Sequence, residues 1–219
     1  MKIKFLFTAL ITFTLMSFKQ SSDKPHFKFA LVMPVEFEIN NELTIDVKSF
    51  EKKMAEKDIV RIKSSKEYSE KEKTELLEAA KSFSLNDAIY AYSIQAFDHY
   101  MHKNDSHVTV DLVTAEEYKD IGIEGLTDKK HKYDYIMHYE HLTLTNKDGA
   151  PSLTSEIDVY CTYQKKNIME NDFTGATTNP GGSFDCSEMG DIGCTLMSFV
   201  QSTVEEVTTA VFKEDQSHK

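Results

Sequence analysis

The spacing of hydrophobic residues predicts a strand, a helix and a second strand in the first half of the chain. The segment from Phe27 to Met33 (FKFALVM) is apolar at its centre on both faces, which is typical of a strand covered on both sides. From Leu85 to Met101 apolar residues recur at helical spacing, after a capping signal at Ser84 or Asn86 and before a polar stop at Asn104 and Asp105. Residues 107 to 113 (HVTVDLV) alternate with a β-branched bias and predict the second strand, which a short polar helix follows.

Two long alternating runs on either side of a turn predict an antiparallel hairpin. The runs are residues 133 to 145 (YDYIMHYEHLTLT) and 155 to 166 (SEIDVYCTYQKK), and the NKDGAP segment between them is a turn signal. Five apolar residues at spacings of four, four, three and four predict a closing helix: Leu196, Val200, Val204, Val207 and Val211. Each valine that this helix buries on the sheet contributes about 1.5 to 3 kcal/mol, which exceeds the modest helix-propensity deficit of valine.

A charged segment separates the first strand from the helix that follows it. Lysine and glutamate interleave from Glu51 to Lys81 within an insertion at about residues 43 to 83, and a capping-box pattern at Ser69 and Glu72 predicts that part of this insertion is helical. No internal repeat or linker divides the rest of the chain. Residues 20 to 219 are therefore expected to form a single α/β (α+β) domain, in which helices pack on a mixed sheet with an antiparallel hairpin.

The first 19 residues predict a secretory signal peptide. Lys2 and Lys4 precede an apolar run from Phe5 to Phe18, and a polar stretch follows it. This run has 14 residues, whereas a membrane-spanning helix needs roughly 20, so an uncleaved anchor is the weaker alternative. We place the start of the mature chain near Gln20, and we expect a secreted or periplasmic protein without stable membrane insertion after cleavage.

Composition narrows the classes of partner. The 219 residues include 25 basic and 36 acidic side chains, for a net charge of -11, and loss of the three lysines in residues 1 to 19 changes it to -14. Such a chain repels nucleic acid and anionic lipid, so we expect neither as a partner. With 8 glycines, 4 prolines and 40% apolar residues, collagen-like and low-complexity sequences are excluded.

Export makes disulfides possible, and the three cysteines differ in their setting. Cys161 lies in a period-two apolar pattern, which is typical of a buried free thiol on a strand. Cys186 and Cys194 lie in a segment that holds five of the eight glycines, where a short bridge closes easily. We predict a structural disulfide between Cys186 and Cys194.

Two groups of residues are candidates for metal binding. His138, Glu140 and His141 are close in sequence, but alternation on a strand sets His141 on the other face, so the two histidines cannot share a metal without a bulge. The trio is therefore interpreted as ordinary sheet-surface residues.

The second group is a possible calcium loop formed by Asp185, Glu188 and Asp191. Hard cations prefer several oxygen ligands, but the spacing of an EF-hand is absent, and a solvated acidic loop is the competing interpretation. No G-x-S-x-G elbow and no phosphate-binding G-K-[ST] signal is present, so no catalytic residue and no cofactor is predicted. The tyrosines Tyr133, Tyr135 and Tyr139 either form a recognition surface or, as we favour, face a helix-covered core.

The order of these elements resembles one known periplasmic module. It is similar to the α/β domain at the amino terminus of the Tol-system protein TolB, shared in outline by the curli secretion protein CsgG and by lipoprotein activators of peptidoglycan synthases. In those families a strand that starts with Asp, Tyr and a hydrophobic residue opens the hairpin, here Asp134, Tyr135 and Ile136. The resemblance covers residues 27 to 213 and rests on element order. It implies a non-enzymatic envelope module that binds other proteins, and the charged insertion departs from its pattern.

We therefore expect an exported, non-enzymatic binding or accessory module of the cell envelope. It would contact envelope proteins through an exposed sheet edge or through the loop at residues 175 to 193. Two alternatives stay open. One is a secreted hydrolase that uses a carboxylate pair, which requires a deep pocket and a carboxylate with a strongly raised pKa. The other is a calcium-dependent surface protein.

Overall fold

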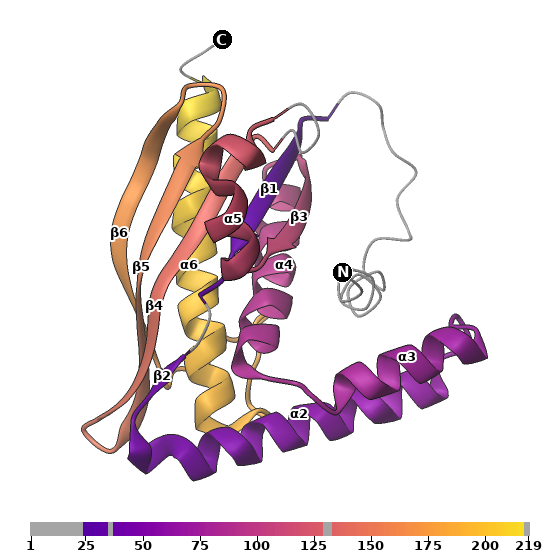
Figure 1. Ribbon diagram of the computed structural model, residues 1–219. Helices are drawn as coiled ribbons and strands as arrows, with labels where there is room; N and C mark the ends of the chain where they lie inside the picture. The colour runs from indigo at the N-terminus through magenta and orange to yellow at the C-terminus, as the bar shows by residue number, and fades with distance from the viewer. Residues whose placement is uncertain (1–23, 35–36, 129–132, 217–219) are drawn as a thin grey trace.

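The computed structural model describes residues 24–34, 37–128 and 133–216, and the expected signal peptide at residues 1–19 lies outside them. Their strands form one mixed sheet in the order β3-β1-β4-β5-β6, with the short β2 beside β4 (Figure 1). The strands are β1 (His26–Val32), β2 (Glu38–Ile39), β3 (His107–Val113), β4 (Tyr135–Lys147), β5 (Ala150–Cys161) and β6 (Lys166–Ala176). β1 runs parallel to both of its neighbours, while β4, β5 and β6 are antiparallel. The expected α/β fold with a mixed sheet and an antiparallel hairpin is confirmed.

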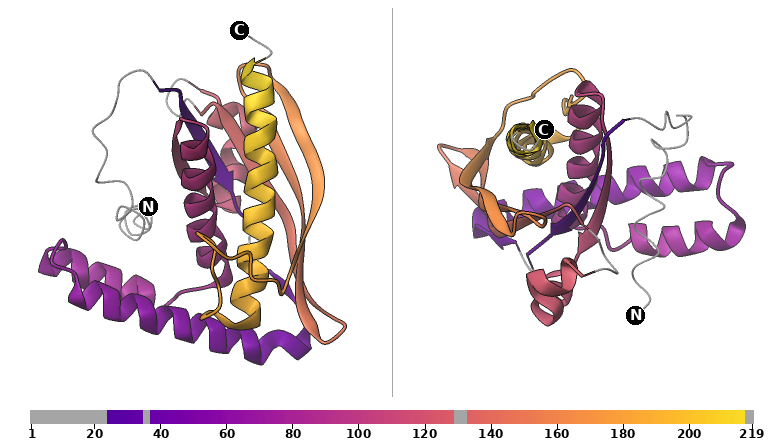
Figure 2. Two further views of the ribbon diagram at one scale, coloured as in Figure 1. Left: turned by 180° about the vertical axis from the view of Figure 1, so that it is seen from behind. Right: turned by 90° about the horizontal axis from the view of Figure 1, so that it is seen from above.

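Helices cover the two faces of this sheet unequally. The α-helices of the described residues are α2 (Thr44–Ser64), α3 (Glu70–Ala80), α4 (Leu85–Lys103), α5 (Ala115–Leu126) and α6 (Gly190–Gln216). Helices α4 and α6 lie side by side on one face, and α5 lies on the opposite face near β1 (Figure 2). The face of β4, β5 and β6 that points away from α4 and α6 is called the outer face below.

Two cores correspond to these two helix layers. The larger core joins the inner face of the sheet to α4 and α6, and Phe29, Tyr135, Tyr139, Phe97 and Phe199 are among its fully buried side chains. The smaller core lies beneath α5 and is formed by Ala30, Val32, Val113, Leu126, Tyr133 and Ile136. The expectation that β1 is covered on both faces is therefore confirmed, because Phe27, Phe29 and Leu31 face the larger core and Ala30 and Val32 the smaller one.

The charged insertion is helical and extends from the body of the protein as an arm. Helices α2 and α3 run side by side away from the sheet (Figure 1). Val47 and Phe50, near the start of α2, belong to the larger core, whereas Ile62, Leu76 and Ala80 form a separate small core between the two helices. Ser69 and Glu72 make the predicted capping box at the start of α3.

Besides the two-residue β2, the sheet contains one longer strand that the sequence pattern did not predict. Residues 166 to 176 (KNIMENDFTGA) form β6, which pairs with β5 along its whole length. Only Met169, Phe173 and Gly175 of this strand are buried. An edge strand that buries so few side chains lacks the hydrophobic alternation that sequence reasoning requires.

Candidate functional site

A change of phase in β4 determines which side chains lie on the outer face. Tyr135, Met137 and Tyr139 are buried against the helices, and Leu142 and Leu144 continue the buried side after a spacing of three residues instead of two. The register with β5 shifts between Glu140 and Thr143. The extra residue that a bulge inserts absorbs this change, so both halves of β4 keep an apolar inner face.

His141 is the extra residue. Its φ of 47° is in the left-handed region, and its side chain is exposed. Strand alternation requires a bulge before His138 and His141 can share a metal. The structure contains the bulge, but His141 does not join a group of ligand atoms with His138 and Glu140 among the described residues.

The bulge sets acidic side chains opposite one another on three strands. Two rows of side chains cross the outer face of these strands. Each row contains one residue from each of β4, β5 and β6, paired directly with its neighbour. The rows are His138, Asp158 and Glu170, followed by Glu140, Glu156 and Asp172. Like charges directly opposite each other destabilise a sheet. Among the described residues, none of the five carboxylates, which we call the acidic patch, forms an ion pair with lysine or arginine.

Asp158 lies at the centre of the acidic patch and has a perturbed ionisation. Burial raises the pKa of its carboxyl to about 6, and the neighbouring charges of Glu140, Glu170 and Glu156 act in the same direction. The residue is partly exposed, but its Oδ1 atom is buried and has no hydrogen-bond partner among the described residues. A buried carboxylate oxygen without a partner is costly and calls for an explanation.

His138 faces Asp158 across the strand pair. Its Nδ1 lies 3.4 Å from Oε1 of Glu140, and its ring packs against Tyr118 of α5 with 5.2 Å between ring centroids. Burial lowers the pKa of the imidazole, and the charge of Glu140 opposes this effect. Burial therefore favours the neutral imidazole, which is the form that binds metals.

In the part of the chain that the structure describes, two groups of possible ligand atoms occur on the outer face. In each group the atoms lie within 4.8 Å of one another: His138, Glu140 and Asp158 form one, and Glu156, Asp158 and Glu170 form the other. From the sequence, His138 and Glu140 are interpreted as ordinary sheet-surface residues, and Asp158 is not identified at all. The signal that would have found it is the apolar spacing of three from Tyr139 to Leu142, which fixes the register of the hairpin.

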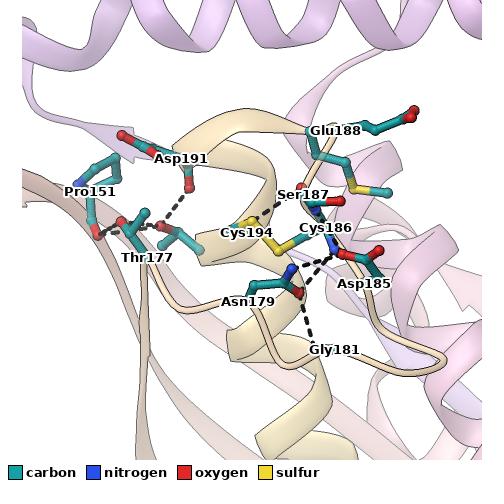
Figure 3. Close-up of a disulfide and its surroundings, with 12 residues drawn as sticks. Pro151, Thr177, Asn179, Gly181, Asp185, Cys186, Ser187, Glu188, Asp191 and Cys194 are labelled. Atoms are coloured by element: carbon teal, nitrogen blue, oxygen red, sulfur yellow. Dashed lines mark hydrogen bonds between the residues drawn. A yellow bond between two sulfur atoms is a disulfide. The ribbon is translucent and has the colours of Figure 1, made fainter.

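The loop after β6 carries the predicted disulfide (Figure 3). A bond joins Cys186 to Cys194 within the first turns of α6, and Cys161 is a buried free thiol on β5. The side chain of Asn179 donates to Asp185 at 2.7 Å and accepts from the backbone of Cys186 at 3.2 Å. The bridge and these hydrogen bonds connect the loop to the start of α6.

The three acidic residues of the possible calcium loop contact different neighbours (Figure 3). Asp185 accepts from Asn179 and from the backbone N–H of Ser187, which lowers the pKa of its carboxyl. Glu188 lies 3.5 Å from Nζ of Lys57, and the backbone carbonyl of Asp191 accepts from Thr195. Among the described residues these three carboxylates do not form a group with ligand atoms within 4.8 Å.

Asp158, whose carboxyl pKa is raised, lies in a different part of the molecule from the hollow at the start of β1. A hollow of about 340 Å³ is lined by Pro25, His26, Phe27, Asp134, Tyr135, Tyr163 and Asp215. Asp158, whose pKa is raised, lies on the outer face and does not line it. The two features that a carboxylate-pair hydrolase requires are therefore not combined at this hollow.

The tyrosines predicted to share one face are divided between the two cores. Tyr135 and Tyr139 are fully buried in the larger core, as favoured, whereas Tyr133 lies in the smaller core beneath α5. Tyr133 precedes the first residue of β4, so strand alternation does not fix its direction.

No helix in the described part of the chain is long and apolar enough to cross a membrane.

Comparison with known proteins gives distant structural likenesses. The chain is similar to PelC from Paraburkholderia phytofirmans, solved as a dodecamer, with 9% identity and a TM-score of 0.30 over 85% of this chain and 93% of that chain. It is also similar to a Xanthomonas campestris protein of the family model DUF330, with 8% identity and a TM-score of 0.33 over 90% and 93% of the two chains. No protein-family model and no curated protein matches the chain. Likenesses this distant carry no argument about function.

Proposed function

We propose that the protein is an exported, non-enzymatic binding module of the cell envelope that contacts a partner protein through the free edge of β6. The observation that supports this proposal most directly is the position of β6 at the end of the sheet. Within the described residues it pairs only with β5, so along its other edge backbone N–H and C=O groups have no strand partner. An extended segment of another protein can add to such an edge through main-chain hydrogen bonds.

The loop that follows β6 extends the same surface. β6 ends at Ala176, and the disulfide-linked segment begins directly after it and runs to the start of α6 at Gly190. Thr177 donates to the carbonyl of Pro151 on β5, and Gln95 of α4 donates to the carbonyl of Ser183. A loop held at these points can present its backbone to a partner with little loss of conformational entropy on binding.

Charge restricts the partner to one with a basic segment. Glu170 and Asp172 are exposed on β6 and belong to the outer face, beside Asp158 and Glu156 of β5. A strand that adds to β6 would bring every second side chain next to these carboxylates. Basic residues at those positions would extend the two acidic rows with favourable cross-strand pairs.

Site-specific photo-cross-linking in the native cells tests this proposal. A photoreactive amino acid replaces Asp172 on β6 in a tagged full-length chain, and the attached proteins are identified by mass spectrometry. We expect a reproducible envelope protein attached through a basic segment. A photoreactive residue in place of Glu75, which is exposed on α3 of the arm, provides the matched control and should not capture the same protein.

Two results would contradict the proposal. Equal capture from positions 172 and 75 would show that the β6 edge is not the contact surface. Absence of any attached protein from position 172, in cells where the chain is exported, would direct attention to the hydrolase alternative and to substrate screening.

A further inference from the structure

We propose that His138, Glu140 and Asp158 bind one divalent first-row transition-metal ion, such as Zn²⁺, on the outer face of the sheet. This inference goes beyond the proposed function and does not depend on it, because it concerns side chains of β4 and β5 rather than the edge of β6.

The backbone places the three ligands around one point. His138 and Glu140 are two residues apart on β4, so they lie on the same face, and Asp158 of β5 is the direct partner of His138. All three offer ligand atoms within 4.8 Å of one another, and Nδ1 of His138 is 3.4 Å from Oε1 of Glu140. Donor atoms around a tetrahedral zinc ion lie about 3.3 Å apart, as follows from metal–ligand distances near 2 Å. Small side-chain movements would complete such a site.

An unsatisfied atom points independently to a ligand. Oδ1 of Asp158 is buried and has no hydrogen-bond partner in the described part of the chain. Buried polar oxygens are nearly always paired with a donor, a water molecule or a cation. A metal ion between Asp158 and His138 would provide the missing partner and would also offset the repulsion between Asp158 and Glu140.

The donor set selects the class of metal. One imidazole nitrogen with two carboxylates suits zinc and neighbouring transition metals, whereas calcium prefers six to eight oxygen ligands. The ring of Tyr118 packs against His138 and restricts the orientation of the imidazole. Three protein ligands on a solvent-facing sheet leave at least one coordination position open, as in zinc sites that bind water or a further ligand.

Isothermal titration of the chelator-treated, dialysed protein with zinc chloride tests the inference. We expect one Zn²⁺ per chain, with calcium chloride unable to compete at equal concentration. His138→Gln and Asp158→Asn should each lower the affinity at least about 10-fold, because loss of a ligand costs no less than loss of a residue that orients one. Zinc should raise the melting temperature of the wild-type protein more than that of His138→Gln.

Two matched variants control for non-specific binding. His141→Gln removes an imidazole from the same strand, and Glu170→Gln removes a carboxylate from the second ligand group, which lacks histidine. Both should retain wild-type zinc affinity, and circular dichroism in chelator should show that all four variants are folded.

The inference is overturned if the wild-type protein binds no zinc or binds several ions without saturation at one. It is also overturned if His141→Gln weakens binding as much as His138→Gln. Loss of affinity in Glu170→Gln together with full affinity in His138→Gln would assign the ion to Glu156, Asp158 and Glu170 instead.

Discussion

The carboxyl group of Asp158 is expected to make the stability of the metal-free protein depend on pH. Its pKa is about 6 in the folded protein and about 3.9 in an unfolded chain. Between these values the folded state holds a proton that the unfolded state releases, so the free energy of unfolding falls as pH rises from about 4 through 6. Asp158 is partly exposed, and solvent screening reduces this effect.

Asp158→Asn should therefore stabilise the metal-free protein at neutral pH. We expect the free energy of unfolding to rise by about 1 kcal/mol at pH 7.5, after the reduction for screening, and the difference from wild type to vanish below about pH 4. Urea unfolding in chelator at the two pH values measures it. A constant difference at both pH values would show that ionisation of Asp158 is not the cause.

A second residue-scale prediction concerns the hydrogen bond between Tyr139 and Ser93. Their hydroxyl oxygens are 3.0 Å apart between β4 and α4, and both side chains are fully buried. Ser93→Ala leaves the tyrosine hydroxyl without a partner and should lower the free energy of unfolding by about 1 to 3 kcal/mol. Tyr139→Phe in the Ser93→Ala background should recover most of this loss. A double-mutant cycle by urea unfolding measures the coupling, and additive effects of the two substitutions would contradict it.

At the scale of elements, the structure agrees with the sequence wherever hydrophobic period and length were both clear. The stripe from Leu196 to Val211 lies on α6, and the capping signal at Ser84 opens α4. The bulge in β4 escaped prediction because the run of residues 133 to 145 was interpreted as one continuous alternation. Its apolar residues in fact change from odd to even positions after Tyr139, and this change is present in the sequence.

The bulge also explains why the sequence indicates His138 and Glu140 as neighbours on one face but not Asp158. The turn pairs Lys147 with Ala150, and uninterrupted counting from that pair would set His138 opposite Val159. Only with the extra residue at His141 does His138 face Asp158, so the third ligand depends on the register of two strands. Burial of the Asp158 oxygen depends further on packing around it, which no spacing in one strand can indicate.

The disulfide between Cys186 and Cys194 carries an element-scale prediction. It closes a short loop with a sequence separation of 8, and constraint of the unfolded chain by such a loop contributes about 2 to 3 kcal/mol. The double variant Cys186→Ala and Cys194→Ala should lose this amount in urea unfolding. Reductant should lower the stability of the wild-type protein similarly and leave the double variant unchanged. An effect of reductant on the double variant would implicate another group.

For the whole molecule, the arm formed by α2 and α3 is expected to open independently of the main body. Its small core of Ile62, Leu76 and Ala80 is separate from the larger core. A segment with few buried apolar contacts opens at a lower free energy than the global unfolding reaction. Leu76→Ala should therefore accelerate amide hydrogen exchange in α3 and in the second half of α2, while exchange in α6 stays as in wild type.

A substitution in the larger core provides the comparison. Val204→Ala, in the fully buried stripe of α6, should accelerate exchange throughout the protein because it lowers the global stability. If Leu76→Ala produced the same uniform acceleration, the arm and the body would form one cooperative unit.

The left-handed residue His141 marks the position at which β4 tolerates a change of chain length. With φ at 47° and the side chain in solvent, His141→Gly should be accepted without loss of stability. Deletion of His141 removes the extra residue and leaves Tyr139 and Leu142 two positions apart, so the alternation would run unbroken through β4. With the turn unchanged, Tyr135 and Tyr139 would stay buried and His138 would still face Asp158, whereas deletion of Thr145 would turn Leu142 and Leu144 toward the outer face. A deletion scan of β4 scored by secreted yield should therefore show a maximum at His141 and a low yield at Thr145.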